Sequence, residues 1–388
     1  MAAAGLWLAA AFLLWRTSVP AGVELPELDA REVFGADHVE RSARYERGLR
    51  LLWLGAVAAQ LTVLTLAAWL APRWGGRGIA AGVALAAATL VAVWLARLPF
   101  VLGAHWWRRR YGISQADYGT ILLDPWLERI GTLLATCAAV AALMLLARGL
   151  GDRWWIVGGA AFAAIAAAFL LAQPYLLVPR LQPLRDAALA AEIRMLAHEQ
   201  GVGEVDVEVR DASRRTRAIN AEIYGVGPTK RIILWDTALD GRLGRGEVRS
   251  LAAHEFGHVE ADHIWKSIGW LFLFAVPGAY VIERVTRPRG GLGRAPAVPL
   301  ALLAFTVLQL ALLPATNAIS RRYEAEADWL ALRATADPRA FEGLTRKLAR
   351  ASLAQPDPPG WARVVFETHP SPLERIAMSR AAALPEGS

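Results

Sequence analysis

The sequence predicts a mainly α-helical polytopic membrane protein with about seven transmembrane helices and a polar region that contains a small β-hairpin or sheet. Of the 388 residues, 55% are hydrophobic and only 20% are charged, and the mean hydropathy is +0.32. This balance is too apolar for a water-soluble globule or for a disordered chain. The apolar residues are also gathered into long stretches, and a helix needs roughly 20 such residues to cross a bilayer.

Seven apolar stretches are candidate transmembrane helices. They are residues 2–15, 50–71, 78–103, 130–147, 154–178, 267–282 and 296–315. The first stretch has no basic residue before its apolar core, and its first basic residue, Arg16, follows that core. This order favours an uncleaved helix with its N-terminus outside the cell, with a signal peptide within residues 1–22 as the alternative.

Arginine-rich connections alternate with arginine-poor ones along the chain. Residues 16–50 and 108–129 are rich in arginine, which places them in the cytoplasm by the positive-inside rule. The same alternation puts 179–265 and 317–388 on the cytoplasmic side, although the connection 283–295, predicted outside, also holds four arginines. Since no basic run carries interleaved aromatic residues, the net charge of +7 does not indicate nucleic-acid binding.

The polar and apolar regions divide the chain into four parts. Residues 1–178 form an N-terminal transmembrane region of about five spans, and residues 266–316 form two more. Residues 179–265 form a cytoplasmic segment in which VDVEV alternates like a strand, and TRAINAEIYG and KRIILW are joined by the turn VGPT as a hairpin. Residues 317–388 form a C-terminal helical segment.

The chemistry of the chain centres on the pentapeptide HEFGH at residues 254–258. His254 and His258 are four apart, so they lie on one face of a helix, one turn from each other. Both imidazoles can therefore reach a single Zn²⁺ at about 2.0–2.1 Å. Glu255 follows the first ligand and can act on a water at the metal as general base. The single cysteine excludes a Cys-based metal cluster.

The third metal ligand is predicted to be a distant carboxylate. Ile264 occupies the position of the third histidine in extended zincin motifs, and His263 is rotated off the ligand face, which favours a helix-end histidine near the membrane surface. Glu324 and Asp328 are four apart on one helix face, whereas Glu326 points elsewhere. Glu324 can bind the metal while Asp328 accepts the spare imidazole N–H of a ligand, although taken alone this pair also suits a solvated helix.

Together these motifs resemble the membrane-integrated zinc metalloproteases typified by the type 1 CAAX prenyl protease family. The resemblance covers most of the chain: five spans before HEFGH, the segment NAEIYGVGPTKRIILWDTAL, the pattern NxxSRxxExxxD at 317–328, and THP at 368–370 followed by Glu374-Arg375. It implies a cytoplasmic zincin-like α/β metalloprotease region. It also implies that His254, His258 and Glu324 bind one Zn²⁺ per chain and that Glu255 is the catalytic base.

The resemblance gives further residues a role. It implies that Asp328 supports the site, that His369 stabilises the oxyanion and that Arg321 holds site carboxylates. It also implies that substrate aligns along Asn220 and Ala221, where an exposed strand edge can bind an extended peptide. Without the resemblance, His369 suits a surface position at a helix N-terminus, and the strand at Asn220 suits an ordinary hairpin.

We therefore expect a zinc-dependent endopeptidase of the bacterial cytoplasmic membrane, since a composition rich in Ala, Gly, Arg and Pro is typical of GC-rich bacterial genomes. Its active site faces the cytoplasm, and its partners are the lipid bilayer and a peptide or protein that is membrane-associated or lipidated. One alternative is an HtpX-like quality-control protease, although such proteins have fewer spans. The others are an inactive scaffold and a transporter, which the lack of charged residues in mid-span disfavours.

Overall fold

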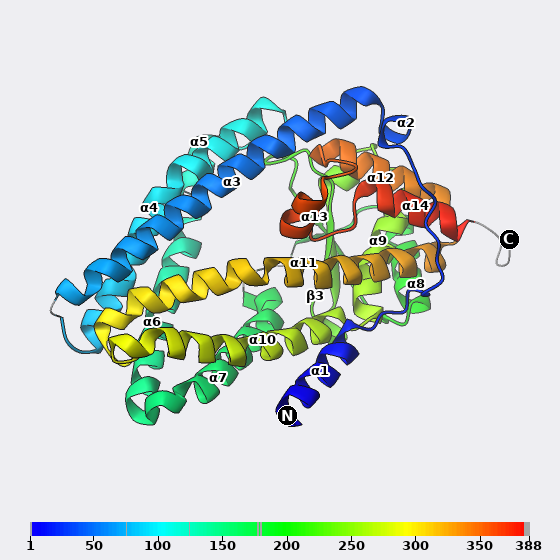
Figure 1. Cartoon of the computed structure of the whole chain (residues 1–388). Coiled ribbons are helices and arrows are strands. Elements are labelled where there is room, and N and C mark those ends of the chain that lie inside the picture. The colour runs from blue at the N-terminus through cyan, green and yellow to red at the C-terminus, as the bar shows by residue number, and fades with distance from the viewer. Residues whose placement is uncertain (1, 75, 124, 177, 179–180, 384–388) are drawn as a thin grey trace.

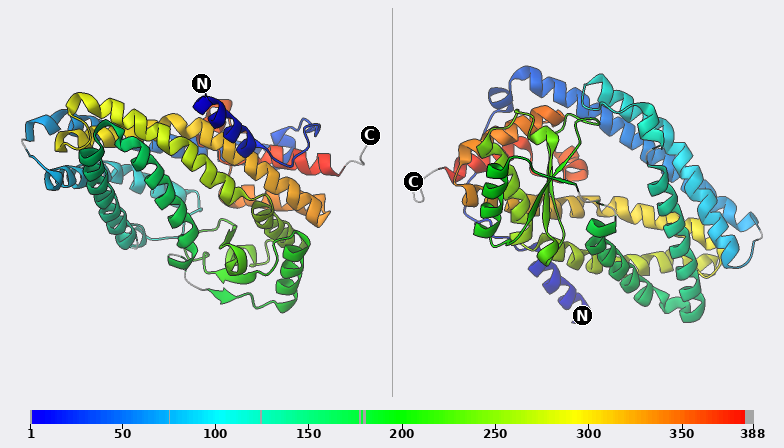
Figure 2. Two further views of the ribbon diagram at one scale, coloured as in Figure 1. Left: turned by 90° about the horizontal axis from the view of Figure 1, so that it is seen from below. Right: turned by 180° about the vertical axis from the view of Figure 1, so that it is seen from behind.

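The computed structural model describes the whole chain except residues 1, 75, 124, 177, 179–180 and 384–388. Long helices extend from one end of the molecule, and the sheet gathers with α8, α9, α12 and α14 at the other end (Figure 1). Figure 2 shows the same two-part arrangement from below and from behind. The predicted fold class, a mainly helical membrane protein with a small sheet, is confirmed.

Five segments of the described chain are long and apolar enough to cross a membrane: Ala36–Trp74, Ile79–Arg110, Tyr118–Gln173, His263–Arg289 and Ala295–Thr335. The helices in these segments are α3 (Ala36–Leu70), α4 (Ile79–Arg110), α5 (Tyr118–Leu123), α6 (Trp126–Leu150), α7 (Trp154–Leu176), α10 (His263–Thr286) and α11 (Val298–Thr335). The third segment contains both α6 and α7, separated by a short turn at residues 151–153. The N-terminal helix α1 (Ala2–Trp15) is a shorter apolar helix. The predicted total of seven spans is therefore not confirmed, whereas the multi-pass character is.

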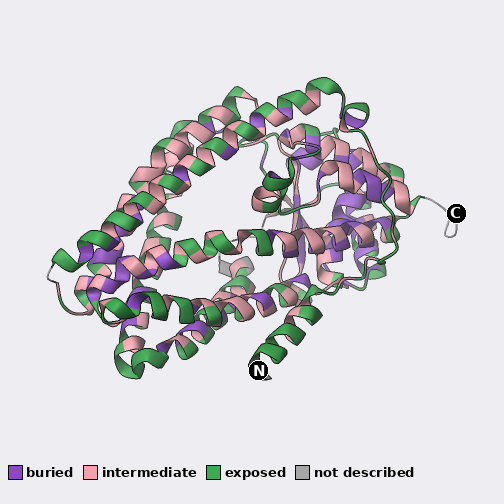
Figure 3. Cartoon of the chain, in the orientation of Figure 1, coloured by how far each residue is buried: buried purple, intermediate pink, exposed green. Residues whose placement is uncertain are grey.

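Large apolar side chains on these helices are exposed, as contact with lipid requires. Leu127 is 87% exposed and Ile165 is 69% exposed, and exposed and half-buried positions alternate along the long helices in Figure 3. Small residues let neighbouring helices approach closely. At Gly159 of α7, an added Cβ would lie 2.8 Å from the Cα of Val276 in α10. The two helices thus pack backbone against backbone there.

The sheet has four strands in the order β1-β2-β4-β3. They are β1 (Gln182–Pro183), β2 (Asp206–Arg210), β3 (Ala221–Tyr224) and β4 (Arg231–Trp235). The predicted hairpin is present, because β3 pairs antiparallel with β4. Strand β3 is shorter than predicted, because the residues before it turn away, with the Thr216 hydroxyl donating to the Ile113 carbonyl at 3.2 Å. As the last strand in the order, β3 forms one edge of the sheet.

A hydrophobic core joins the sheet to the helices around it. These are α8 (Ala187–Glu199), α9 (Arg245–Glu260), α12 (Pro338–Ser352) and α14 (Pro372–Ala382), with the short α2 (Ala30–Phe34) and α13 (Gly360–Phe366) at the periphery. Ile193, Ile232, Leu234, Phe256 and Phe341 are fully buried in this core. Helix α11 also contributes Ala331 and Leu332. It therefore runs as one continuous helix across the predicted boundary at residue 316, from the apolar region into the core.

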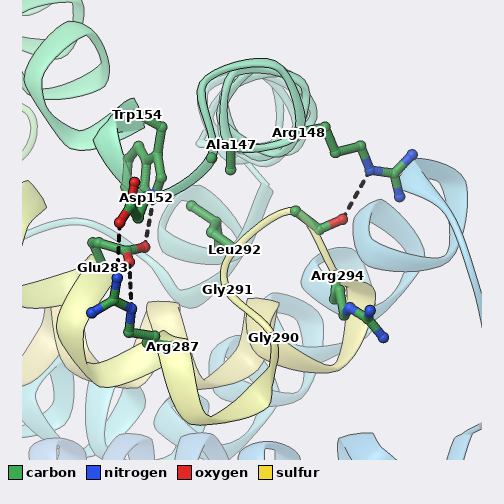
Figure 4. Close-up of a pocket in the computed structure, with 12 residues that line it drawn as sticks. Ala147, Arg148, Asp152, Trp154, Glu283, Arg287, Gly290, Gly291, Leu292 and Arg294 are labelled. Atoms are coloured by element: carbon green, nitrogen blue, oxygen red, sulfur yellow. Dashed lines mark hydrogen bonds and ion pairs between the residues drawn. The ribbon is translucent and has the colours of Figure 1, made fainter.

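A cavity of about 570 Å³ lies between α6, α7, α10 and the connection after α10 (Figure 4). The contacts around this cavity show what holds the arginine-rich connection 283–295 in place. Arg287 pairs with Asp152 at 2.8 Å, and Arg148 donates to the Gly293 carbonyl at 2.9 Å. The buried Glu283 accepts from the Trp154 indole at 3.0 Å. Arginines in this region therefore serve to fasten helix ends, and no predicted site residue lines the cavity.

Candidate active site

Helices α9 and α11 bring the three predicted metal ligands together. His254 and His258 lie one turn apart on α9, and Glu324 reaches them from α11. The Oε2 atom of Glu324 lies 3.2 Å from His254 Nε2 and 3.7 Å from His258 Nε2. The two Nε2 atoms are 3.3 Å apart. One ligand atom from each residue lies within 4.8 Å of the others, which is the spacing of donors around one ion.

The donors also fit a metal by their hydrogen bonding. Glu324 Oε2 is buried and faces imidazole nitrogens at 3.2–3.7 Å, but it forms no hydrogen bond of regular geometry within the described chain. An orphaned buried carboxylate oxygen is costly unless another group, such as a cation, compensates it. Burial lowers the pKa of His258 to about 3, which keeps this imidazole neutral. The pKa of His254 is instead raised, against the effect of burial, beside Asp328 and Glu324, and this residue would release its proton on binding an ion. A His₂Glu set is also a common catalytic zinc arrangement.

Asp328 and Arg375 form the support behind His254. Asp328 is fully buried, and its Oδ1 lies 2.8 Å from His254 Nδ1. Arg375 of α14 binds the same carboxylate with two hydrogen bonds of 2.8 and 2.7 Å. The position of Asp328 is the one that its predicted role requires, since a carboxylate on Nδ1 leaves Nε2 facing the metal position. The role of Arg375 was missed, because only the packing of α14 against α11 reveals it.

Glu255 lies between the ligands and the sheet. It lines a cavity of about 830 Å³ together with His258 and Glu324. Burial raises the pKa of Glu255 to about 7, while the charge of His254 and a hydrogen bond from the Ile223 backbone lower it. The bond from Ile223 places the edge strand β3 directly beside this carboxylate. A carboxyl group whose pKa lies near neutrality can take and return a proton efficiently.

His369 and Arg321 lie on the other side of the ligands. His369 Nε2 is 3.2 Å from Glu324 Oε2, and its side chain is 55% exposed, so it faces the open side of the site. Arg321 donates to the carbonyls of Arg363 and Glu367 at 2.8 and 2.6 Å. It thus fastens the segment that carries His369, and the expectation that it holds site carboxylates is not what the described contacts show.

Asn220 and Ala221 lie at the start of the edge strand rather than in its middle. Ala221 is the first residue of β3 and is only 3% exposed. The Asn220 carbonyl accepts from the Trp235 backbone at 3.1 Å. Both residues therefore fix the register of β3 against β4, at the strand that borders Glu255.

His263 lies at a helix end, as predicted, because it is the first residue of α10 and of a candidate membrane span; its contact with the ligand His258 was not predicted. His263 is 5% exposed, and its Nδ1 lies 2.8 Å from His258 Nδ1. The reason is that α9 ends at Glu260, and Asp262 adopts a left-handed backbone with φ of 56°. The turn brings His263 back toward the ligands, whereas an unbroken helix would carry it away.

Gly257 sets the distance between α9 and α11. A Cβ at this position would lie 3.0 Å from both the Cα and the carbonyl oxygen of Ala327. We expect Gly257→Ala to weaken metal binding about tenfold or more, because backbone cannot rotate aside and Glu324 must move away from the histidines. Alanine favours the helix over glycine by about 1 kcal/mol, but this gain in helix stability does not bring Glu324 back to the two histidines.

Metal affinity measured by chelator competition checks this expectation. The matched control is Gly278→Ala, since an added Cβ there meets nothing within 4 Å. Unchanged affinity in Gly257→Ala would show that the two helices adapt without cost to the site.

Comparison with known proteins relates the chain to metallopeptidases. The family model "Peptidase family M48" matches residues 183–383, more than half of the chain. A curated relative, the "Uncharacterized metalloprotease YhfN" of Bacillus subtilis, is 31% identical over 237 residues, which cover 58% of this chain and 55% of that protein. A "CAAX prenyl protease 1 homolog" of Oryza sativa subsp. japonica is 24% identical over 253 residues, which cover 61% of this chain and 58% of that protein. The matched part thus spans little more than half the length of these relatives.

A solved structure shares the whole architecture. The crystal structure of S. mikatae Ste24p superposes with a TM-score of 0.74 at 17% identity and covers 96% of each chain. At this identity the likeness concerns the fold, including the long helices and the region around the sheet. Since the family model covers most of the region that holds HEFGH and Glu324, the chain belongs to peptidase family M48 and has the membrane fold of the Ste24 type.

Proposed function

We propose that this chain is a zinc-dependent endopeptidase that hydrolyses peptide bonds at a membrane. The convergence of His254, His258 and Glu324 with Glu255 beside them carries the proposal. These are the two histidines, the carboxylate ligand and the base that metal-assisted hydrolysis requires. The metallopeptidases of the family support the same conclusion.

The residues of the site have distinct tasks in this reaction. A bound Zn²⁺ supplies polarisation of the scissile carbonyl and makes a nearby water more acidic. Glu255 accepts the proton of the attacking water and passes it to the leaving amine. His369, which faces the open side of the ligands, donates a hydrogen bond to the developing oxyanion. Arg321 holds the segment that positions His369.

The edge of β3 is proposed to bind the substrate backbone. Since Asn220 bonds to Trp235 and antiparallel pairs alternate, Glu222 and Tyr224 direct their backbone groups toward β4. The backbone groups of Ala221 and Ile223 then point to the free edge. A peptide added there as a further strand lies beside Glu255, to which the Ile223 N–H already points.

The walls of the site cavity favour an apolar or lipidated substrate from the membrane. Glu255 and His258 line one part of the cavity of about 830 Å³. Apolar side chains from the membrane helices line another part: Leu170, Trp270, Leu271, Phe274 and Ile319. This pattern supports a prenylated peptide, as the names of the CAAX relatives suggest, over a soluble loop. The arginine-rich connections support a cytoplasmic orientation of the site in a bacterial membrane.

The test is metal content and cleavage by the detergent-purified full chain. We expect about one zinc per chain and hydrolysis of a farnesylated peptide faster than of its unmodified form or casein. His254→Ala is expected to lose both zinc and activity, because it removes one of three ligands. If the purified protein holds no zinc even after zinc has been added, the proposed site is refuted. Faster cleavage of casein or unfolded membrane proteins would favour a quality-control protease.

A further inference from the structure

We infer that His263 is a positioning residue for the metal ligand His258 and that Glu326 fixes it in that task. The inference rests on the proposed zinc site. It concerns a histidine and a carboxylate that the catalytic steps do not use. His263 and Glu326 are both buried, with exposures of 5% and 2%. Among the described contacts, His263 is the partner of His258 Nδ1, the nitrogen that faces away from the other ligands.

The contacts form a chain that runs away from the metal position. His258 Nδ1 lies 2.8 Å from His263 Nδ1, and His263 Nε2 lies 3.0 Å from Glu326 Oε2. If His258 binds metal through its Nε2, its proton sits on Nδ1 and is donated to His263 Nδ1. His263 must then carry its own proton on Nε2, which donates to the Glu326 carboxylate. Every hydrogen bond in this chain has one donor and one acceptor.

The Glu326 carboxyl group is itself held in place by two further contacts. The Lys266 ammonium lies 3.2 Å from its Oε2, and the Ser18 backbone N–H donates to its other oxygen. The ring of His263 stacks on Tyr323, with centroids 4.5 Å apart and planes 12° from parallel. Position and plane of the His263 ring are thus both defined by neighbours.

The two ligand histidines therefore receive equivalent support from different elements. His254 Nδ1 meets the carboxylate of Asp328 directly, whereas His258 Nδ1 reaches the carboxylate of Glu326 through His263. Partners of this kind fix the tautomer and ring orientation of a ligand, and their loss typically costs about 10–100-fold in metal affinity. The left-handed turn at Asp262 makes this second route possible.

The test measures zinc affinity by competition with a chromophoric chelator in the detergent-purified full chain. His263→Phe keeps an aromatic ring to stack on Tyr323 but removes both nitrogens, so its zinc dissociation constant is expected to rise about 10–100-fold. His263→Asn keeps an oxygen near the position of Nδ1 and is expected to recover most of the affinity. His263→Met, an apolar variant without an aromatic ring, replaces His263→Phe if the latter does not fold.

Tyr323→Phe is the matched control. It removes the hydroxyl, which donates to the Leu14 carbonyl at 2.7 Å and accepts from Trp270 at 2.9 Å, but leaves the contacts of His263 unchanged. Its zinc affinity is expected to equal that of the parent. Any loss of folding stability would appear only as a lower melting temperature of the metal-free protein, measured in the presence of chelator. Parental affinity in His263→Phe, or equal weakening in Tyr323→Phe, would overturn the inference. If the parent chain itself binds no zinc, the proposed function fails instead.

Discussion

Glu255→Gln is expected to lower kcat/KM by about 10²–10⁴-fold, the usual contribution of a general acid–base group, while zinc binds as in the parent. The amide has nearly the same shape as the carboxylate but cannot take the proton of the attacking water. The three ligands on α9 and α11 keep their own contacts, so the metal is retained. Metal content and cleavage of a fluorogenic peptide, measured on the same preparation, separate these two effects.

The control for this variant is Glu260→Gln. Glu260 is an exposed residue at the end of the same helix, and its neutralisation is expected to leave kcat/KM unchanged. Substantial turnover by Glu255→Gln would remove Glu255 from its role as base. Loss of zinc in Glu255→Gln would show that the residue acts on the site's structure instead.

The same carboxyl group predicts the acid limb of the pH profile. Burial raises the pKa of Glu255 to about 7, and a divalent cation nearby lowers it again by favouring the carboxylate. Since the base acts in its deprotonated form, kcat/KM is expected to fall about tenfold per pH unit below its pKa in the loaded enzyme. An acid limb at the same pH in the residual activity of Glu255→Gln would contradict this assignment.

Asp328→Ala is expected to cost about 3–5 kcal/mol in folding stability, because it leaves a buried cation without its partner. The Arg375 side chain is only 13% exposed and makes both of its charged hydrogen bonds to this carboxylate. The ligand His254 also loses its acceptor, so the affinity for zinc is expected to drop about 10–100-fold. Thermal unfolding in chelator and zinc competition measure the two losses separately.

The double variant Asp328→Ala with Arg375→Met isolates the unpaired charge. It removes both partners, so we expect it to regain much of the stability that the single variant loses, without regaining zinc affinity. Such a cycle reports the coupling between the two residues. If the double variant is as unstable as Asp328→Ala alone, the cost comes from the lost volume of the carboxylate instead.

The sequence predicts those parts of the site that depend on position along one unbroken helix. His254 and His258 share a face by spacing alone, and so do Glu324 and Asp328, and the structure brings these faces together. The same reasoning missed the contact of His263 with His258, because it assumes a helix that continues through Asp262. Arg375 could not be predicted either, since its contact with Asp328 depends on how α14 docks against α11.

The sheet shows the same limit. The turn VGPT before KRIILW predicted β4 as one strand of a hairpin, and its pairing with β3 and its fully buried Ile232, Ile233 and Leu234 confirm it. Residues 216–219 were predicted as part of β3 but lie outside it, because Thr216 bonds to the connection after α4. A pattern of apolar residues shows which segments can form strands, whereas contacts from distant segments decide where each strand begins.

The split of the metal ligands between α9 and α11 bears on when the enzyme becomes active during its synthesis. His254 and His258 leave the ribosome long before Glu324, since two apolar helical segments must be made and inserted between them. The arginine that supports the site, at position 375, and His369 come later still. A nascent chain thus lacks part of the candidate site, and we expect the proposed peptidase activity only after α11 and α14 have been made and α11 has docked against α9.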